Sequence, residues 1–171
     1  MRGLSIILDI DGCLCNFVDG FETEFNVEYT SLTSNEISEK VASLKRNYKF
    51  WTKLDKLTTL DFTPSAYCTA RINSKNSTKV WLKNNGFPNS PVYQVLGYDL
   101  SKVPQLKRTP IKNEDVRVFI DDSWKNVQDA INNGIPAFLL DTPYNQDVTT
   151  HLRIKDLKFK TICNAYKRFY F

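Results

Sequence analysis

Residues 66–140 alternate between short apolar runs and helical patterns, and this alternation restricts the fold more than any other feature of the sequence. The apolar runs have the length of β-strands and lie at residues 5–8, 66–69, 92–96, 116–120 and 137–140. Amphipathic helical patterns cover residues 74–85 and 123–133, and a short basic helix is expected from about residue 101. Strands that alternate with helices pack as a parallel sheet covered on both faces. We therefore predict an α/β fold with a doubly wound, Rossmann-like parallel sheet of about five strands.

The first and second strands are separated by about fifty residues, far more than the usual connection in such a sheet. Phe17, Phe21 and Phe25 recur at helical spacing in this segment. A second helix begins at Thr33, where T-S-N-E forms a capping box, and its pattern continues to Tyr48. We predict a core of residues 1–13 and 63–171, with residues 14–62 inserted as a small helical cap.

Two pairs of aspartates follow predicted strands. Asp9 and Asp11 end the first strand and precede a glycine, and Asp121 and Asp122 end the strand at 116–120. If these strands are neighbours, all four carboxylates meet at one edge of the sheet. Oxygen ligands without histidine favour Mg²⁺. The alternatives are an Asp-Gly turn after the first strand and a helix N-cap at Asp122 or Ser123.

The net charge of +4 is concentrated at the C-terminal end, because residues 151–171 hold six basic residues and one acidic residue. Such a segment contacts nucleic acid or phosphate, or is simply a solvated surface. No apolar stretch has the length needed to cross a bilayer, and the first strand begins too early for a signal peptide. The four cysteines lack paired C-x-x-C spacing. We expect a cytoplasmic protein with reduced thiols and no membrane partner, and a homodimer remains open.

The ordered set of motifs resembles the haloacid dehalogenase superfamily of phosphotransferases over residues 5–140. The matching motifs are D-I-D-G after the first strand, C-T-A-R after the second, a lysine before the fourth and V-F-I-D-D at its end. More narrowly, T-K-V-W-L-K-N-N-G-F-P, F-I-D-D-S-W-K-N-V and D-T-P-Y-N are similar to the 5′(3′)-deoxyribonucleotidase family and its phage and bacterial relatives. This resemblance implies Mg²⁺-dependent hydrolysis of (deoxy)nucleoside monophosphates.

The resemblance also implies roles for single residues. Asp9 would be the nucleophile that forms an aspartyl-phosphate, and Asp11 would be the general acid and base. Mg²⁺ would be held by Asp9, the backbone carbonyl of Asp11 and Asp121, with Asp122 acting directly or through water. Thr69 would donate its hydroxyl to a phosphoryl oxygen, although on its own it is an ordinary residue at the end of a strand.

The positive partner of the phosphate and the aromatic contacts are further expectations. Lys102 matches the phosphate-binding lysine best, and the alternatives are Lys107 and Lys112. Arg71 contacts phosphate or sugar, or caps local carbonyls.

Phe50 and Trp51 are adjacent in the predicted cap, where at least one of them could stack on a nucleobase, joined by Phe17. The alternative is packing in the core. The turn containing Tyr144 is expected to pack against the loops of the site. Cys13 follows the first pair of aspartates closely, so we expect it either to pack beneath that loop or to make the activity sensitive to oxidation.

Two other functions remain open. The same chemistry could act on 3′ or 5′ ends of nucleic acid, with the basic C-terminal segment holding the polymer. The chain could also keep the fold without turnover, as a binding module.

Overall fold

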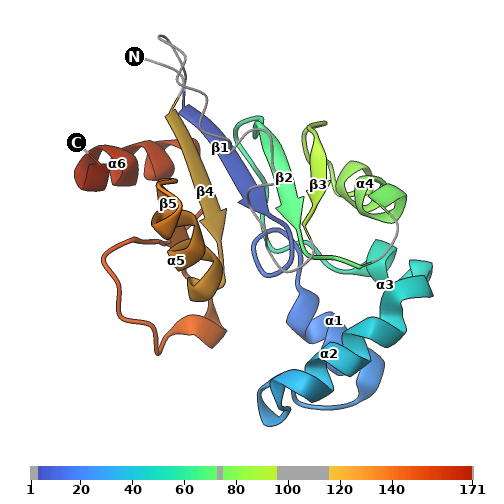
Figure 1. Cartoon of the computed structure of the whole chain (residues 1–171). Coiled ribbons are helices and arrows are strands. Elements are labelled where there is room, and N and C mark those ends of the chain that lie inside the picture. The colour runs from blue at the N-terminus through green and yellow to red at the C-terminus, as the bar shows by residue number, and fades with distance from the viewer. Residues whose placement is uncertain (1–3, 73–74, 96–115, 171) are drawn as a thin grey trace.

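The computed structural model describes residues 4–72, 75–95 and 116–170. Its centre is a six-stranded sheet in which all paired neighbours are parallel and the strand order is β3-β2-β1-β4-β5-β6 (Figure 1). The strands are β1 (Leu4–Asp9), β2 (Ala66–Thr69), β3 (Val92–Gln94), β4 (Val116–Asp121), β5 (Ala137–Leu140) and β6 (Arg153–Ile154). The predicted α/β fold with a doubly wound parallel sheet is confirmed, and β6 extends the sheet beyond the five expected strands.

Helices cover both faces of the sheet. In β1, Ile6 and Leu8 point to one face, where they join a core that includes Trp81 of α4 (Lys75–Asn84) and Ile162 of α6 (Phe159–Tyr170). Ile7 points to the other face, which is covered by α5 (Trp124–Asn132). Successive strand residues alternate between the two covered faces, so the buried residues Ile6, Ile7 and Leu8 that precede Asp9 are all apolar.

The cap lies beyond the carboxyl ends of β1 and β2 (Figure 1). Its elements are α1 (Phe17–Phe25), the 3₁₀ turn η1 (Tyr29–Ser31), α2 (Ser34–Ser43), the 3₁₀ turn η2 (Leu44–Arg46) and α3 (Tyr48–Lys53). The predicted capping box is present: Thr33 Oγ1 accepts from the Glu36 backbone at 3.3 Å, and the Thr33 N–H donates to the Glu36 carboxylate at 2.8 Å.

The prediction of one helix continuing to Tyr48 was wrong. The helix ends at Ser43, and a new helix starts after Asn47, whose side chain accepts a hydrogen bond from Phe50 N at 3.0 Å and so acts as an N-cap. The break at η2 leaves the Leu44 carbonyl available to the indole Nε1 of Trp51, at 2.8 Å. This bond turns the Trp51 ring inward.

The chain crosses between core and cap twice, and the two crossing segments pair with each other. Asn16 N donates to Asp55 O, and Leu57 N donates to Leu14 O, both at 2.8 Å. The return crossing therefore lies at residues 55–57, whereas the predicted cap extends to residue 62. Beyond the crossing, Asp61 already contacts the core, since its carboxylate accepts from the first residue of α6 at 2.9 Å.

None of the helices in the described ranges is both long enough and apolar enough to span a membrane. The basic helix expected from about residue 101 lies outside the described residues.

Candidate active site

The four predicted carboxylates lie at the point where the strand order reverses. β1 pairs directly with β4, with Leu8 opposite Ile120, so Asp9 and Asp121 end adjacent strands. The sequence predicts that the acids meet if these two strands are neighbours, and the strands are neighbours in the structure. Both side chains are completely buried. Asp122 follows β4, and ligands bind at such a crevice in open α/β sheets.

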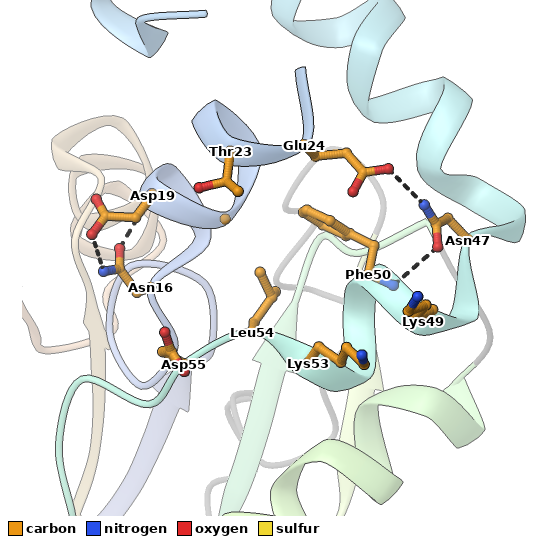
Figure 2. A pocket seen from close by; sticks show the side chains of 11 residues that line it. Asn16, Asp19, Thr23, Glu24, Asn47, Lys49, Phe50, Lys53, Leu54 and Asp55 are labelled. Carbon is orange, nitrogen blue, oxygen red and sulfur yellow. Dashed lines mark hydrogen bonds between the residues drawn. The ribbon is translucent and has the colours of Figure 1, made fainter. Parts of the chain in front are cut away.

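A cavity of about 560 Å³ opens at this edge of the sheet, between the core and the cap. Asp11 and Asp122 line it from the core, and Phe17 and Trp51 line it from the cap. Phe50 lies elsewhere: it lines a separate groove of about 420 Å³ between α1 and α3 (Figure 2). Of the three predicted aromatic contacts, the structure therefore brings two to the cavity that contains the acids.

Asp11 is held by a bidentate ion pair with Arg71. The arginine Nε lies 2.9 Å from both carboxylate oxygens, and Nη2 lies 2.8 Å from Oδ1. The hydroxyl of Thr69 donates to Oδ2 at 3.1 Å, and the thiol of Cys15 donates to Oδ1 at 3.0 Å. The Asp11 carboxylate, whose side chain is 19% exposed, is thereby fixed in orientation.

The Arg71 guanidinium lies inside the protein. Its Cζ is 5.2 Å from the ring of Trp51 in the cap and 5.4 Å from the ring of Trp81 in the core. Burial alone would lower the pKa of Arg71, but Asp11 raises it, and the side chain stays charged. Its Nη1 atom is buried and has no hydrogen-bond partner within the described part of the chain. Whether Arg71 also contacts phosphate or sugar stays a prediction.

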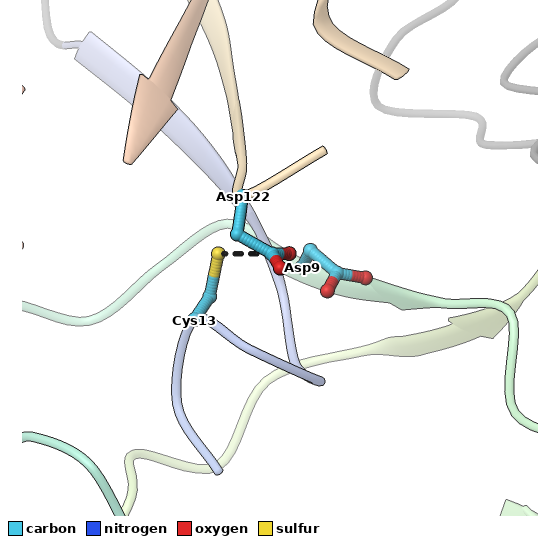
Figure 3. A group of neighbouring side chains, drawn as sticks. All are labelled: Asp9, Cys13 and Asp122. Atoms are coloured by element: carbon cyan, nitrogen blue, oxygen red, sulfur yellow. Dashed lines mark hydrogen bonds between the residues drawn. The ribbon is translucent and has the colours of Figure 1, made fainter. Parts of the chain in front are cut away.

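A second group of side chains could hold a metal ion. Ligand atoms of Asp9, Cys13 and Asp122 lie within 4.8 Å of one another (Figure 3). Burial, together with the carboxylates of Asp122 and Asp9, raises the pKa of Cys13 well above its usual range, so its sulfur is a neutral S–H. The two carboxylates fit a hard cation such as Mg²⁺, which accepts water or carbonyl oxygens in its remaining positions. The neutral thiol is a poor ligand for that ion.

Asp121, one of the predicted metal ligands, is turned toward α5. Its carboxylate accepts from the backbone of Ser123 at 2.8 Å and from Asn126 Nδ2 at 3.1 and 3.2 Å. Burial and the neighbouring Asp122 raise the pKa of Asp121 well above its usual range. Ser123 is the N-cap residue of α5, and its side chain makes no capping hydrogen bond.

The 3₁₀ turn η6 (Pro143–Asn145) packs against the site, as predicted. Tyr144 Oη donates to Asp122 Oδ2 at 2.6 Å, and Asn145 Nδ2 donates to Asp122 O at 2.9 Å. Gly12 lies beneath this contact with φ of +81°, and a Cβ there would overlap both Asp122 Oδ2 and Tyr144 Oη. Burial raises the pKa of Asp122 to about 6, an effect that the Tyr144 hydrogen bond opposes.

Arg153 of β6 anchors the segment that carries Tyr144. Its guanidinium donates to Asn145 Oδ1 at 2.7 Å and to the carbonyls of Asn145 and Val148 at 2.8 and 2.6 Å. It also pairs with Asp141 at 2.6 Å. Hydrogen bonds from Gln146 and Arg153 hold the pKa of Asp141 below its ordinary value.

The predicted cationic residues are only partly placed. Lys102, Lys107 and Lys112 lie outside the described residues. At the C-terminal end, Tyr170 Oη accepts from Ala137 N, at the amino end of β5. The end of α6, with two of the basic residues, therefore lies at the edge of the sheet opposite the acids (Figure 1).

Sequence reasoning did not assign Cys15 and Trp81 to the site. Cys15 follows Asp11 by four residues in the same loop, and this closeness was the only signal. Trp81 is identifiable from the sequence as a buried position of its helix, but nothing local indicates that its ring reaches Arg71.

Neither models of known protein families nor curated proteins gave a match to this chain when it was compared with them. The function is therefore inferred from the site itself.

Proposed function

We propose that the protein is a Mg²⁺-dependent phosphomonoesterase of the haloacid dehalogenase type, which hydrolyses (deoxy)nucleoside monophosphates to nucleoside and phosphate. The observation that carries the proposal is the convergence of Asp9, Asp11 and Asp122 at the β1–β4 edge, next to a cavity with aromatic walls. Together with the motifs D-I-D-G and V-F-I-D-D, this arrangement favours phosphoryl transfer over simple ligand binding.

Asp9 would carry the covalent step. One carboxylate oxygen attacks phosphorus, the bond from phosphorus to the nucleoside oxygen breaks, and an aspartyl-phosphate forms. Asp11 would give a proton to the leaving oxygen, then take one from the water that cleaves the aspartyl-phosphate. The position of Asp11 on the cavity wall, two residues from Asp9, supports the second step, whereas the first step requires that a proton replace one of the contacts with Arg71.

The carboxylates of Asp9 and Asp122 would hold the metal ion, with the Asp11 backbone carbonyl as a further ligand. A bound divalent cation neutralises charge on the transferring phosphoryl oxygens, and this type of stabilisation supplies most of the catalysis in phosphoryl transfer. The donor set supports Mg²⁺, since its two charged members are oxygen ligands. Cys13 would remain a buried neighbour.

The cavity supports a substrate with a planar apolar group. Phe17 is half-buried and stacks on Trp51, with ring centroids 6.0 Å apart and planes 17° apart. Trp51 is only 1% exposed, so Phe17 is the ring that could offer a face to a nucleobase. The volume of about 560 Å³ is within the range of small-molecule sites. Lys167 and Arg168 at the end of α6 give no support to action on nucleic-acid ends, because they lie at the opposite edge of the sheet.

The test is phosphate release from a panel of ribo- and deoxynucleoside monophosphates and a phosphorylated oligonucleotide, with Mg²⁺ or with EDTA. We expect Mg²⁺-dependent release from mononucleotides, none from the Asp9→Asn variant, and full activity in the matched control Asp129→Asn, an acid of α5 that forms an ion pair with Lys125 on the surface. Phosphate release from the oligonucleotide alone would show that the substrate is the end of a nucleic acid and not a mononucleotide. No release from any compound would refute the proposed function.

A further inference from the structure

Arg71 makes contacts that an ordinary phosphate-binding arginine does not need. It follows β2, yet its side chain is 0% exposed and its charge lies between one tryptophan of the cap and one of the core. Burying a charge is costly unless it is paired and hydrogen-bonded. Here the cost is offset by Asp11 and by the faces of Trp51 and Trp81.

The geometry of the ion pair fixes the plane of the Asp11 carboxylate. Arg71 contacts both oxygens through two nitrogens, at 2.8 to 2.9 Å. Thr69 holds Oδ2 from a third direction, and its Oγ1 in turn accepts from the Arg71 backbone at 3.1 Å. A planar fork can impose such an orientation, whereas the point charge of a lysine cannot.

The two tryptophans connect this fork to the cap. Trp51 is held within the cap by its bond to the Leu44 carbonyl. Trp81 belongs to the core helix α4, and its Nε1 donates at 2.6 Å to the carbonyl of Leu54, which follows α3. A displacement of α3 would therefore withdraw the Trp51 ring from the guanidinium and disturb the contact between Trp81 and Leu54 together.

We propose that Arg71 is a positioning residue that sets the orientation of the Asp11 carboxylate and couples it to the position of the cap. The coupling is a property of the folded chain and stands without any enzymatic activity. Only its consequence for turnover rests on the proposed function, through the proton that Asp11 would carry.

The coupling can be measured without substrate by a double-mutant cycle on urea unfolding. The cycle combines Asp11→Asn with Trp51→Leu, first in the presence of Arg71 and then in an Arg71→Met background. We expect the shifts in urea midpoint caused by Asp11→Asn and by Trp51→Leu to be non-additive when Arg71 is present and additive in the Arg71→Met background. Additivity in both backgrounds would overturn the proposal. If Trp51→Leu does not fold, Trp51→Phe gives the same comparison with a smaller ring.

The consequence for catalysis is tested with Arg71→Lys, which keeps the charge and loses the fork. Because a misplaced catalytic group costs about 100-fold, we expect kcat to fall by about that factor while KM changes little. Guanidinium ion, well below denaturing concentrations, should restore part of the kcat of Arg71→Ala. The control Phe25→Leu removes a cap aromatic ring that packs on Phe21 and lies under the ammonium group of Lys40, and it should keep the wild-type kcat.

The outcomes separate the two proposals. An inactive wild-type protein whose unfolding cycle is non-additive would refute the phosphatase and keep the coupling. An active protein whose Arg71→Lys variant keeps the wild-type kcat would keep the phosphatase and refute the positioning role.

Discussion

Gly12→Ala tests whether the loop after β1 must approach Asp122 as closely as the structure indicates. Gly12 and Gly86 both have a left-handed backbone, with φ of +81° and +77°. Their surroundings differ: a Cβ at Gly12 would overlap Asp122 and Tyr144, whereas a Cβ at Gly86 would meet no atom within 4 Å. Gly86→Ala is therefore a matched control that carries the backbone strain without the crowding.

The expected magnitudes follow from these contacts. A left-handed alanine costs about 1–2 kcal/mol at either position. At Gly12 the added methyl group must also separate Tyr144 Oη from Asp122 Oδ2, which breaks a hydrogen bond of 2.6 Å. A bond to a charged group contributes about 1.5–3 kcal/mol, which we reduce to about 1–2 kcal/mol because Tyr144 is 39% exposed. We expect total losses of about 2–4 kcal/mol for Gly12→Ala and about 1–2 kcal/mol for Gly86→Ala.

The assay is urea unfolding of both variants beside the wild type, with the free energy of unfolding compared at equal slope. Phosphate release is a second readout: it should be lost in Gly12→Ala, because Asp122 is displaced, and kept in Gly86→Ala. Equal free energies of unfolding for the two variants would show that the loop has room for a side chain and would refute the close approach.

Three further perturbations test other parts of the structure. In the native protein a thiol reagent should modify Cys163, while the three buried cysteines, whose thiol pKa burial raises, should react only after denaturation; rapid modification of all four would contradict their burial. Asn126→Ala removes two hydrogen bonds from the buried carboxylate of Asp121 and should lower the free energy of unfolding by about 1–3 kcal/mol in urea. Because the pKa of Asp141 is lower in the folded than in the unfolded protein, this acid contributes stability at pH values above its unfolded pKa. That contribution should be lost as the pH falls below about 4 and the acid is protonated. That part of the pH dependence of Tm should be missing in Asp141→Asn.

The sequence predicts the sheet well because its signals are local. Each buried strand is a short apolar run, and helix ends are marked by residues such as Thr33. The sequence predicts that Asp9 and Asp121 meet only if their strands are neighbours, and the structure supplies that condition by pairing β1 with β4. β6 was not among the five expected strands: residues 152–159 alternate in character, but only Arg153 and Ile154 of this stretch pair with β5.

The contacts of the site could not be predicted in the same way. Arg71 and Asp11 are sixty residues apart in sequence, and an arginine after a strand fits many roles until its surroundings are known. Phe50 and Trp51 illustrate a related limit. Adjacent residues of a helix point in directions about 100° apart. The sequence therefore excludes that both rings point the same way, but it does not say which of them faces the acids.

The paired segments at residues 14–16 and 55–57 have a consequence for protein engineering. The cap enters and leaves the core at one place, where the two crossing segments are joined by backbone hydrogen bonds of 2.8 Å. A replacement for the intervening residues can keep this pairing, provided that it supplies an aromatic ring for Arg71 and a carbonyl acceptor for Trp81. Transplanting caps of other shapes onto this platform offers a direct way to alter which molecules reach the acids.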